Sequence, residues 1–535
     1  MKRTYGRFYG VLGMVMGVGV MSGCSVRSYA GPAVAALKGA VESHRTVKPF
    51  LPEGLVLVES LSAESPPDTL EPPLKEVLLS LEAVRTAVLM HNLKLKVAVL
   101  ERDIAVAQVG GAKAAFDWLL VGSATRTGGA AFGGEMDLGS LGLTVPLPGG
   151  GSVSVTPGVE GATEDEEITA ALGFSVSQPL LRGAGVGSST ASIAVARISG
   201  AVGNARAKLG AIELLGEAEK VYWDLYGAVK AHEVQVAQYA LAEEQVLHAQ
   251  RYVESGFASE VEVLRAQAGL TARMEAVIVA GTTLRRRERA LKRLLNRPDL
   301  PVGSGTRLLA ETAPTPEGVI LDRGKLVELA RKERMDLFEA ELILVMRDVE
   351  RAKAVNDLLP EVGFLGSVSY FGTEAASLKG AFERIGVKGE FPGQWSVGVM
   401  ASFPLQNRGA RAAAEAARMR ELQSRWARDE LFKEVEREVY DAADVFEGSW
   451  ERILATRKAT VAAGLTYEAE KRQFQLGVVT STEVLEAAGA LSLVQLREIE
   501  ALVDYQKARV EVALATGTML GMGAVEWGQT LGERP

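Results

Sequence analysis

The sequence predicts a mainly α-helical protein that also contributes to a membrane β-barrel, with long coiled-coil α-helical hairpins and four β-strands per chain. Three observations lead to this fold class. The chain of 535 residues repeats one plan of elements twice. Its longest helical segments carry small apolar residues at a period near 3.5. Four segments of about ten residues alternate between apolar and polar side chains, which is typical of strands that separate two environments.

The N-terminus resembles a bacterial lipoprotein signal. Basic residues precede the apolar stretch "FYGVLGMVMGVGVM", which is too short for a typical membrane-spanning helix. The stretch ends in "MSGC", and Cys24 is the only cysteine of the chain. We therefore expect residues 1–23 to be a lipoprotein signal peptide and Cys24 to carry a covalent lipid. An ordinary signal peptide with an incidental cysteine is the alternative interpretation.

Two structural repeats are expected after a lipid-anchored tether at residues 24–74. The first repeat, residues 75–297, is predicted to contain a helix and then, in order, strand 117–128, a loop, strand 169–178, a long helix 183–253 and a helix 258–297. The second repeat, residues 325–520, is predicted to contain a helix and then strand 361–372, a loop, strand 394–403, a long helix 408–474 and a helix 479–517. A linker rich in proline and glycine, residues 298–324, joins the repeats, and residues 521–535 form a C-terminal tail.

Local similarities between the two halves support this division. The stretch "FSVSQPLLRGAG" (174–185) is similar to "VMASFPLQNRGA" (399–410). In "ESGFASEVEVL" and in "QLGVVTSTEVL", a glycine is followed six residues later by Glu-Val-Leu, which predicts a glycine turn between two helices. The turn glycines are Gly256 and Gly477.

The long helices carry coiled-coil spacing. Apolar residues step by three and four along both of them, which predicts helices that supercoil about neighbours. In the first repeat these residues are Ile198, Val202, Ala205, Leu209 and Ile212, and in the second they are Val435, Val439, Ala442, Phe446, Trp450 and Ile453.

The four strands are predicted to separate lipid from a water-filled lumen. In strand 394–403 one face is apolar, with Trp395 and Phe403 near its ends, and the other face is small or polar. A sheet packed on a soluble core would give the same alternation, but the signal peptide and the absence of other strands for a second layer disfavour it, and the glycine-rich residues 128–167 suit an extracellular loop. Four strands cannot close a barrel, so the chain must oligomerise. Pro179 and Pro404 mark the strand-to-helix junctions, because proline ends a strand and tolerates a helix after it.

The order and duplication of these patterns resemble the TolC family of outer-membrane efflux proteins. The Gln-Pro-Leu and Phe-Pro-Leu junctions, "LLPEVGFLGSVSYFG" (358–372) and the two glycine-to-Glu-Val-Leu turns carry the resemblance, which covers nearly all of residues 75–520. It implies a homotrimer with a 12-stranded barrel and a periplasmic tunnel of 12 helices. It also implies partners, namely a periplasmic adaptor (membrane fusion) protein and an inner-membrane transporter, and a location in the outer membrane, in contact with its lipid, with a large periplasmic portion.

The resemblance also implies a periplasmic gate at the two glycine turns. Glu262 corresponds to the acidic residue after the first turn, and Glu483 and Glu486 correspond to an acidic pair after the second. Three copies of such carboxylates around an axis would attract cations. The alternative is that Glu483 and Glu486 are solvated acids that favour a helix start. An arginine and a tyrosine lock the aperture in some relatives, and here Val479 and Phe474 stand in their places, so closure must depend on packing or on other charges.

Other function classes are disfavoured. The net charge of −8 and the lack of a dense basic face exclude nucleic acid as the main partner. "RGAGVG" (182–187) lacks the spacing and the βαβ context of a dinucleotide site. The four histidines lack ligand spacing, so no metal site is expected, and His232 is interpreted as a packed or interhelical hydrogen-bonding residue. No hydrolase, protease or P-loop motif is present, so we expect neither catalysis nor a cofactor beyond the lipid on Cys24.

The sequence therefore favours a passive exit channel of a tripartite efflux or type I secretion system. The alternative is a lipid-anchored coiled-coil spacer of the cell envelope, without channel activity. A spacer would have no need for alternating strands, which is why the channel is preferred.

Overall fold

The computed structural model describes residues 75–129, 134–162, 167–256, 259–375, 378–385, 393–476 and 478–522. These residues divide into two compact units. The helical unit comprises the described parts of residues 71–112, 191–355 and 409–535. The sheet unit comprises the described parts of residues 113–190 and 356–408. The predictions for Cys24, Gly477, the signal peptide, the tether and most of the C-terminal tail concern residues outside the described ranges.

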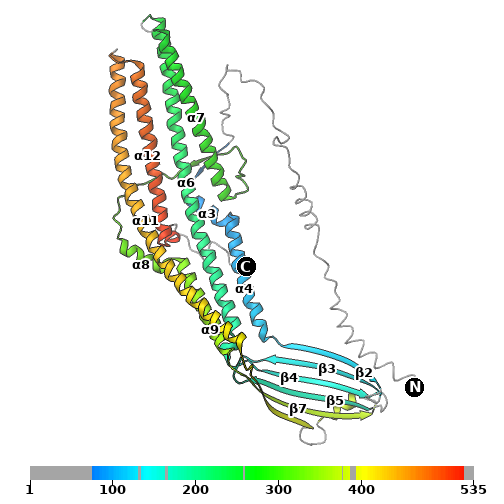
Figure 1. Ribbon diagram of the computed structural model, residues 1–535. Coiled ribbons are helices and arrows are strands. Elements are labelled where there is room, and N and C mark those ends of the chain that lie inside the picture. The colour runs from blue at the N-terminus through cyan, green and yellow to red at the C-terminus, as the bar shows by residue number, and fades with distance from the viewer. Residues whose placement is uncertain are drawn as a thin grey trace, which may run out of the picture. The chain divides into compact units, whose positions relative to one another are not determined.

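The helical unit contains two long helical hairpins (Figure 1). The first pairs α6 (Ala191–Glu254) with α7 (Glu260–Leu295), and the second joins α11 (Arg408–Gln475) to α12 (Ser481–Ala515). Shorter helices complete the unit: α3 (Leu81–His91), α4 (Leu93–Lys113), α8 (Arg323–Glu333), α9 (Met335–Asn356) and α13 (Met519–Met522). The predicted long helices 183–253 and 408–474 correspond to α6 and α11. The first starts later than predicted, because the four-residue helix α5 (Val186–Ser189) precedes it.

Side-chain caps fix several of these helix ends. The Ser80 hydroxyl accepts from the Ala83 N–H at the start of α3, and the Asp322 carboxylate accepts from the Lys325 N–H at the start of α8. Asn296 ends α7 in the left-handed conformation, with φ 45°. The predicted linker also contains regular structure, since β6 (Arg307–Ala310) pairs in parallel with β1 (Glu76–Leu79).

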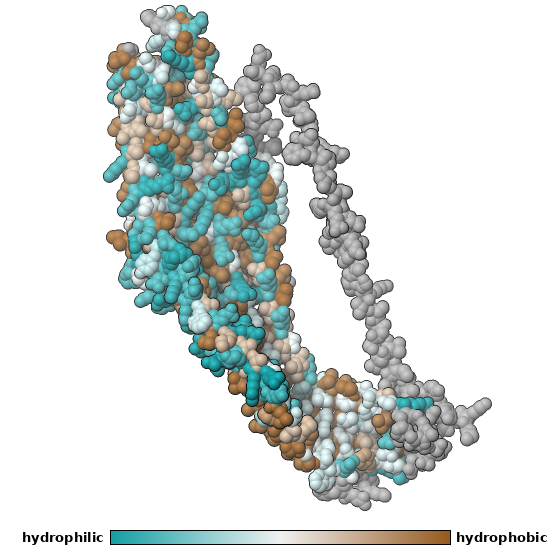
Figure 2. All heavy atoms as spheres, in the orientation of Figure 1, coloured by the Kyte–Doolittle hydropathy of each residue, from teal (hydrophilic) through white to brown (hydrophobic). Residues whose placement is uncertain are grey.

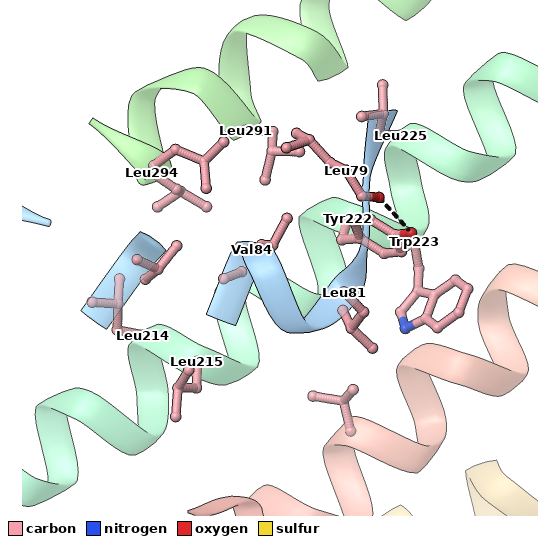
Figure 3. Packing of buried hydrophobic residues seen from close by; sticks show 14 of the residues in the cluster. Leu79, Leu81, Val84, Leu214, Leu215, Tyr222, Trp223, Leu225, Leu291 and Leu294 are labelled. Carbon is pink, nitrogen blue, oxygen red and sulfur yellow. Dashed lines mark hydrogen bonds between the residues drawn. The ribbon is translucent and has the colours of Figure 1, made fainter. Parts of the chain in front are cut away.

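The predicted heptad residues form the helical core. Val202, Ala205 and Ile212 of α6 are buried, as are Val435, Val439, Ala442, Phe446 and Ile453 of α11. The largest cluster packs α6 against α3, α7 and β1 (Figure 3). Within it, the Tyr222 hydroxyl donates to the Leu79 carbonyl oxygen at 3.2 Å and accepts from the Thr312 N–H at 2.9 Å. Burial raises the pKa of Tyr222.

Two glycines let α6 and α12 approach closely. A Cβ atom built on Gly216 would lie 2.7 Å from Leu514, and one on Gly227 would lie 2.9 Å from Val503. Both neighbours are side chains of α12 that occupy the space a larger residue would need. The absence of a side chain at these positions therefore sets the distance between the two helices.

The sheet unit is a single antiparallel sheet in the order β2-β3-β4-β5-β7-β8. Its strands are β2 (Leu119–Gly129), β3 (Gly134–Pro146), β4 (Ser152–Ala162), β5 (Glu167–Pro179), β7 (Glu361–Ala375) and β8 (Gln394–Ser402). Strands from both repeats meet where β5 pairs with β7. The edges are β2 and β8, and β8 is exposed along its whole length.

The prediction of four strands per chain is wrong, because this sheet has six. Residues 128–167, interpreted as an extracellular loop, instead contain the hairpin of β3 and β4. Their glycines and Pro157 lower β propensity, which hid the strands. Nevertheless small polar and apolar residues alternate in the stretch "SVSVTPGV" at 152–159. This stretch forms β4 because β3 and β5 bind its backbone on either side.

Candidate functional site

One face of the sheet is mainly apolar and receives apolar side chains from all six strands, with Arg126 of β2 and Glu374 of β7 on the same face near the end away from the strand-to-helix junctions. The strand registers align Leu120 with Leu143, Val155 with Phe174, and Val368 with Trp395. Since side chains alternate along a strand, residues two positions apart join the same face. Besides those six residues, this face carries Leu141, Val145, Val153, Val159, Leu172, Val176, Phe364, Val397 and Val399.

The opposite face carries hydroxyl groups. Cross-strand hydroxyl pairs lie between Ser123 and Ser140 at 2.7 Å, Ser154 and Ser175 at 2.6 Å, and Ser367 and Ser396 at 2.8 Å. They join β2 to β3, β4 to β5 and β7 to β8. Over the sheet unit, Figure 2 shows mainly pale side chains with some brown and little strongly hydrophilic surface. The two faces of the sheet therefore differ: one is mainly apolar, and the other carries these hydroxyl groups together with apolar side chains such as Val121 and Leu365.

The strand-to-helix junctions lie at one end of the sheet. Pro179 is the last residue of β5 and lies opposite Gly363 of β7. Pro404 follows the end of β8 by two residues, and α11 starts at Arg408 after Asn407, which has φ 42°. Prolines at these positions have no N–H for a further strand pairing, which agrees with their predicted place between strand and helix.

Asn356 is a junction residue that the sequence did not single out. Its side-chain oxygen accepts from the Gly183 N–H at 2.8 Å and from the Ser188 hydroxyl at 3.0 Å. Nearby, the Asn407 amide donates to the Leu358 carbonyl oxygen at 3.0 Å. Two asparagines thereby hold the segments after β5 and β8 beside the segment before β7. Asparagine is common in loops, so nothing in its spacing marked this role.

The first glycine turn has the conformation that the sequence predicts. Gly256 follows α6 with φ 74°, and its N–H donates to the Val253 carbonyl oxygen at 3.0 Å. Glu262 lies in the first turn of α7, and Arg265 donates to its carboxylate at 2.8 Å. Glu262 is therefore partly neutralised within its own chain.

At the second turn Glu483 forms a helix cap. Its Oε2 accepts from the Thr480 N–H at 2.7 Å, and the Thr480 side chain accepts from the backbone of Glu483, which together make a capping box. The Glu486 side chain is exposed on the next turn of the helix. Glu483 thus has the helix-start role that the sequence left open as the alternative, and a role at an axis would need further copies of the chain.

An aromatic pair lies close to these turns. Phe474 of α11 stacks on Tyr252 of α6, with ring centroids 6.3 Å apart and an interplanar angle of 26°. A stacked pair of aromatic rings here holds the ends of two helices together without charge.

The titratable groups of the helical core serve its structure. Lys292 donates to the Ser304 and Thr306 carbonyl oxygens at 2.9 and 2.6 Å, and Glu288 accepts from the Leu308 N–H at 3.1 Å. Burial lowers the pKa of Lys292 and raises that of Glu288. Among the described residues, no group of three or more histidine, cysteine, aspartate or glutamate side chains is arranged to hold a metal ion.

None of the helices in the described part of the chain combines the length and the apolarity that crossing a membrane requires.

Comparisons with known proteins identify relatives for this architecture. Residues 326–518 match the family model described as outer membrane efflux protein. The fold is similar to that of CusC, at 16% identity with a TM-score of 0.63, covering 82% of this chain and 92% of the other. It is also similar to the CmeC outer membrane channel of Campylobacter jejuni, at 16% identity with a TM-score of 0.62, covering 84% and 87%.

A third similar structure is the outer membrane protein VceC of Vibrio cholerae, at 16% identity with a TM-score of 0.61, covering 82% of this chain and 96% of the other. A search of curated protein sequences gave no match. Residues 326–518 therefore carry an outer membrane efflux protein domain, and the fold over 82–84% of the chain is similar to that of solved outer-membrane proteins, in agreement with the resemblance to the TolC family seen in the sequence.

Proposed function

We propose that the protein is the outer-membrane exit channel of a tripartite efflux or type I secretion system. The observation that carries the proposal is the two-faced sheet, which is apolar on one side and lined by hydroxyls on the other. A strand wall between lipid and a water-filled lumen requires this division. The family match of residues 326–518 supports the same function.

The open edges of the sheet support assembly of several copies. β2 and β8 form its edges, and an unpaired strand edge is not tolerated in lipid. Pairing of β8 of one copy with β2 of the next would remove both edges. The resemblance to the TolC family favours three copies, a lipid on Cys24, a periplasmic adaptor and an inner-membrane transporter. Because exit is passive in this proposal, the partners supply the energy.

The gate is proposed at the two helix turns that carry Glu262, Glu483 and Glu486. Three copies would supply a ring of carboxylates, and the Tyr252–Phe474 stack would supply the packing contact in place of a polar lock. Within one chain Arg265 contacts the Glu262 carboxylate and Glu483 caps its own helix, whereas the Glu486 side chain is exposed. We therefore assign Glu486 the larger share of the ring's charge.

The test is planar-bilayer conductance of the detergent-purified oligomer, with its mass measured on the same sample. A trimer with discrete, cation-selective conductance is the expected result. A species that neither trimerises nor inserts would contradict the channel and favour the lipid-anchored spacer. A trimer that inserts but carries no current would indicate a closed gate. The variant Tyr252→Ala, which removes the Tyr252–Phe474 stack, should then restore the current.

A further inference from the structure

We propose that the β3–β4 hairpin is a segment of the channel wall that widens the passage, so that the assembled barrel has six strands per chain. The passage would admit solutes too bulky for a wall with four strands per chain. This inference rests on the proposed channel function. It concerns the hairpin that the chain inserts between β2 and β5, and it follows from how that hairpin pairs, which way its side chains face and how its turn is held.

The hairpin is paired on both of its sides. β3 pairs with β2 along the whole of β2, from Leu119 with Thr144 to Gly129 with Gly134. β4 pairs with β5 from Ser152 with Ser177 to Gly161 with Ile168. A loop that folds into a lumen or extends into solvent would leave β2 and β5 free to pair with each other. Here the backbone groups of both strands are instead used by the hairpin.

The side chains of the hairpin continue both faces of the sheet. Leu143, Val145, Val153 and Val155 join the apolar face, aligned with Leu120 on one side and with Phe174 and Val176 on the other. Ser140, Thr144 and Ser154 join the hydroxyl face, where Ser140 contacts Ser123 and Ser154 contacts Ser175. A segment immersed in water on both sides needs no continuous apolar face, whereas a wall between lipid and lumen does.

The turn of the hairpin is fastened to the strand-to-helix junction. The Gly149 carbonyl oxygen accepts from the Gln178 side chain at 3.0 Å and from the Gly185 N–H at 3.1 Å. The Ser189 hydroxyl donates to the Pro148 carbonyl oxygen. Gly150 has φ 88°, and a Cβ atom built there would lie 2.3 Å from the Gly183 carbonyl oxygen. The turn is thus built into the end of the sheet that carries the junctions.

The extra strands change the width of the passage. The diameter of a barrel grows roughly linearly with its number of strands, so six strands per chain in place of four widen it about 1.5-fold for any number of copies. The cross-section of the barrel would rise about twofold, and in the Tyr252→Ala background, where the proposed gate is loosened, the conductance would rise by up to the same factor. The hairpin adds hydroxyl groups and the carboxylate of Glu160 to the inner face.

A variant that lacks the β3–β4 hairpin can test the inference, because β2 and β5 already run in the directions that an antiparallel pair requires. The three antiparallel pairings β2-β3, β3-β4 and β4-β5 leave β2 antiparallel to β5, and Leu120 and Phe174 lie on the same face. Replacing residues 130–166 by Asn-Gly would join Gly129 to Glu167 through a two-residue turn. The even-numbered residues of both strands would then still share the apolar face.

The experiment compares the intact protein with this variant in planar bilayers, both in the Tyr252→Ala background, using polyethylene glycols of graded size as probes of the passage. We expect equal copy numbers by mass, a conductance lower by up to about twofold in the variant and exclusion of smaller polymers. Equal conductance and an equal size limit at equal copy number would overturn the inference. If the intact protein neither assembled nor inserted, the proposed function would fail instead. If it inserted but carried no current, the labelling experiment below would decide the place of the hairpin.

Two cysteine variants keep the test independent of whether the shortened chain assembles. Both are made in the full-length chain carrying Cys24→Ser, so that each has one thiol. Ser154→Cys should react with a membrane-impermeant thiol reagent, whereas the adjacent Val155→Cys should react only with a lipid-soluble one. Reaction of both thiols with the impermeant reagent would show that the hairpin is bathed in water and would overturn the inference.

Discussion

Glu483 illustrates how one residue can serve its own helix and an assembly. Within the chain its carboxylate caps α12 through the Thr480 N–H. In the proposed trimer the same side chain would lie in a ring with Glu486. These roles have different requirements, because a cap needs an acceptor oxygen and a ring needs charge. An amide keeps the first and removes the second.

The double variant Glu483→Gln with Glu486→Gln should therefore weaken block of the single-channel current by a multivalent cation, by about tenfold in blocking concentration, while the melting temperature stays unchanged. Glutamine keeps the capping box, whereas alanine would cost about 1 kcal/mol of helix stability and blur the result. Glu430→Gln, an exposed change on α11, is the matched control. Unchanged block in the double variant would rule out the acidic ring.

His232 predicts a pH effect on stability. Its imidazole packs near Gly281 of α7, and burial, together with the positive charges of Arg307 and Arg285, lowers its pKa. The unfolded chain therefore binds this proton more readily, so the contribution of neutral His232 to stability is complete above about pH 6.5 and is lost as the pH falls through the lowered value. His232→Gln should reduce the drop in melting temperature between pH 7.5 and pH 5. An equal drop in both proteins would disprove this.

At the scale of elements, close packing and alternating faces decide the structure. α6 and α12 approach where Gly216 and Gly227 leave room for Leu514 and Val503. Strands β5 and β7 pair across the two repeats over 13 residue pairs, so neither repeat forms the sheet alone. Helix spacing and strand pairing thus both join distant parts of the sequence.

Gly227→Ala should lower the free energy of unfolding by about 1–3 kcal/mol, because its Cβ would press on Val503. Val503→Ala removes the opposing methyl groups, so adding it to Gly227→Ala should recover part of the loss. Thermal unfolding of the two single variants and the double variant gives the coupling. Strict additivity of the two losses would show that this contact does not limit the approach of the helices.

Ser396 and Val397 are adjacent residues of β8 on opposite faces of the sheet. A substitution by aspartate should therefore affect membrane insertion at Val397 and not at Ser396. Val397→Asp places a charge on the apolar face, which opposes insertion of a lipid-facing strand, at a cost below the about 2–4 kcal/mol of a Lys or Arg near the middle of a bilayer. Ser396→Asp places it on the hydroxyl face, where water would solvate it. Membrane fractionation should show Val397→Asp depleted from the outer membrane and Ser396→Asp retained. Equal insertion of both would argue against lipid on the apolar face.

At the scale of the whole molecule, the membrane attachment of the proposed assembly has two independent parts. One is the apolar face of the sheet, and the other is the lipid expected on Cys24. The strands of an inserted barrel are held in the bilayer by their own apolar face, so we expect the assembly to stay in the membrane without the lipid.

Cys24→Ser should accordingly abolish acylation and leave most of the protein in the outer membrane as an oligomer. Intact mass of the purified protein measures the lipid, and membrane fractionation measures the location. A normal acylated mass in the variant would disprove the lipoprotein signal. Complete release from the membrane would show that the lipid, and not the sheet, holds the protein there.

Local sequence patterns were sufficient to predict the long helices and four of the six strands of the sheet, namely β2, β5, β7 and β8. Val202, Ala205 and Ile212 step at a period that only a packed helix explains, and Trp395, Val397 and Val399 alternate as only a two-faced strand requires. Gly256 marked its turn because the left-handed conformation favours glycine. These signals are local, so they could be read along the chain.

Tertiary structure alone decided the number of strands and the contacts at the turns. β3 and β4 are rich in glycine, and they form strands because β2 and β5 supply hydrogen-bonding partners on either side. Likewise the Tyr252–Phe474 stack and the contacts of Asn356 join residues more than 150 positions apart. The free energy gained when distant strands pair does not depend on local β propensity alone. A segment that was expected to be a loop is therefore part of the sheet.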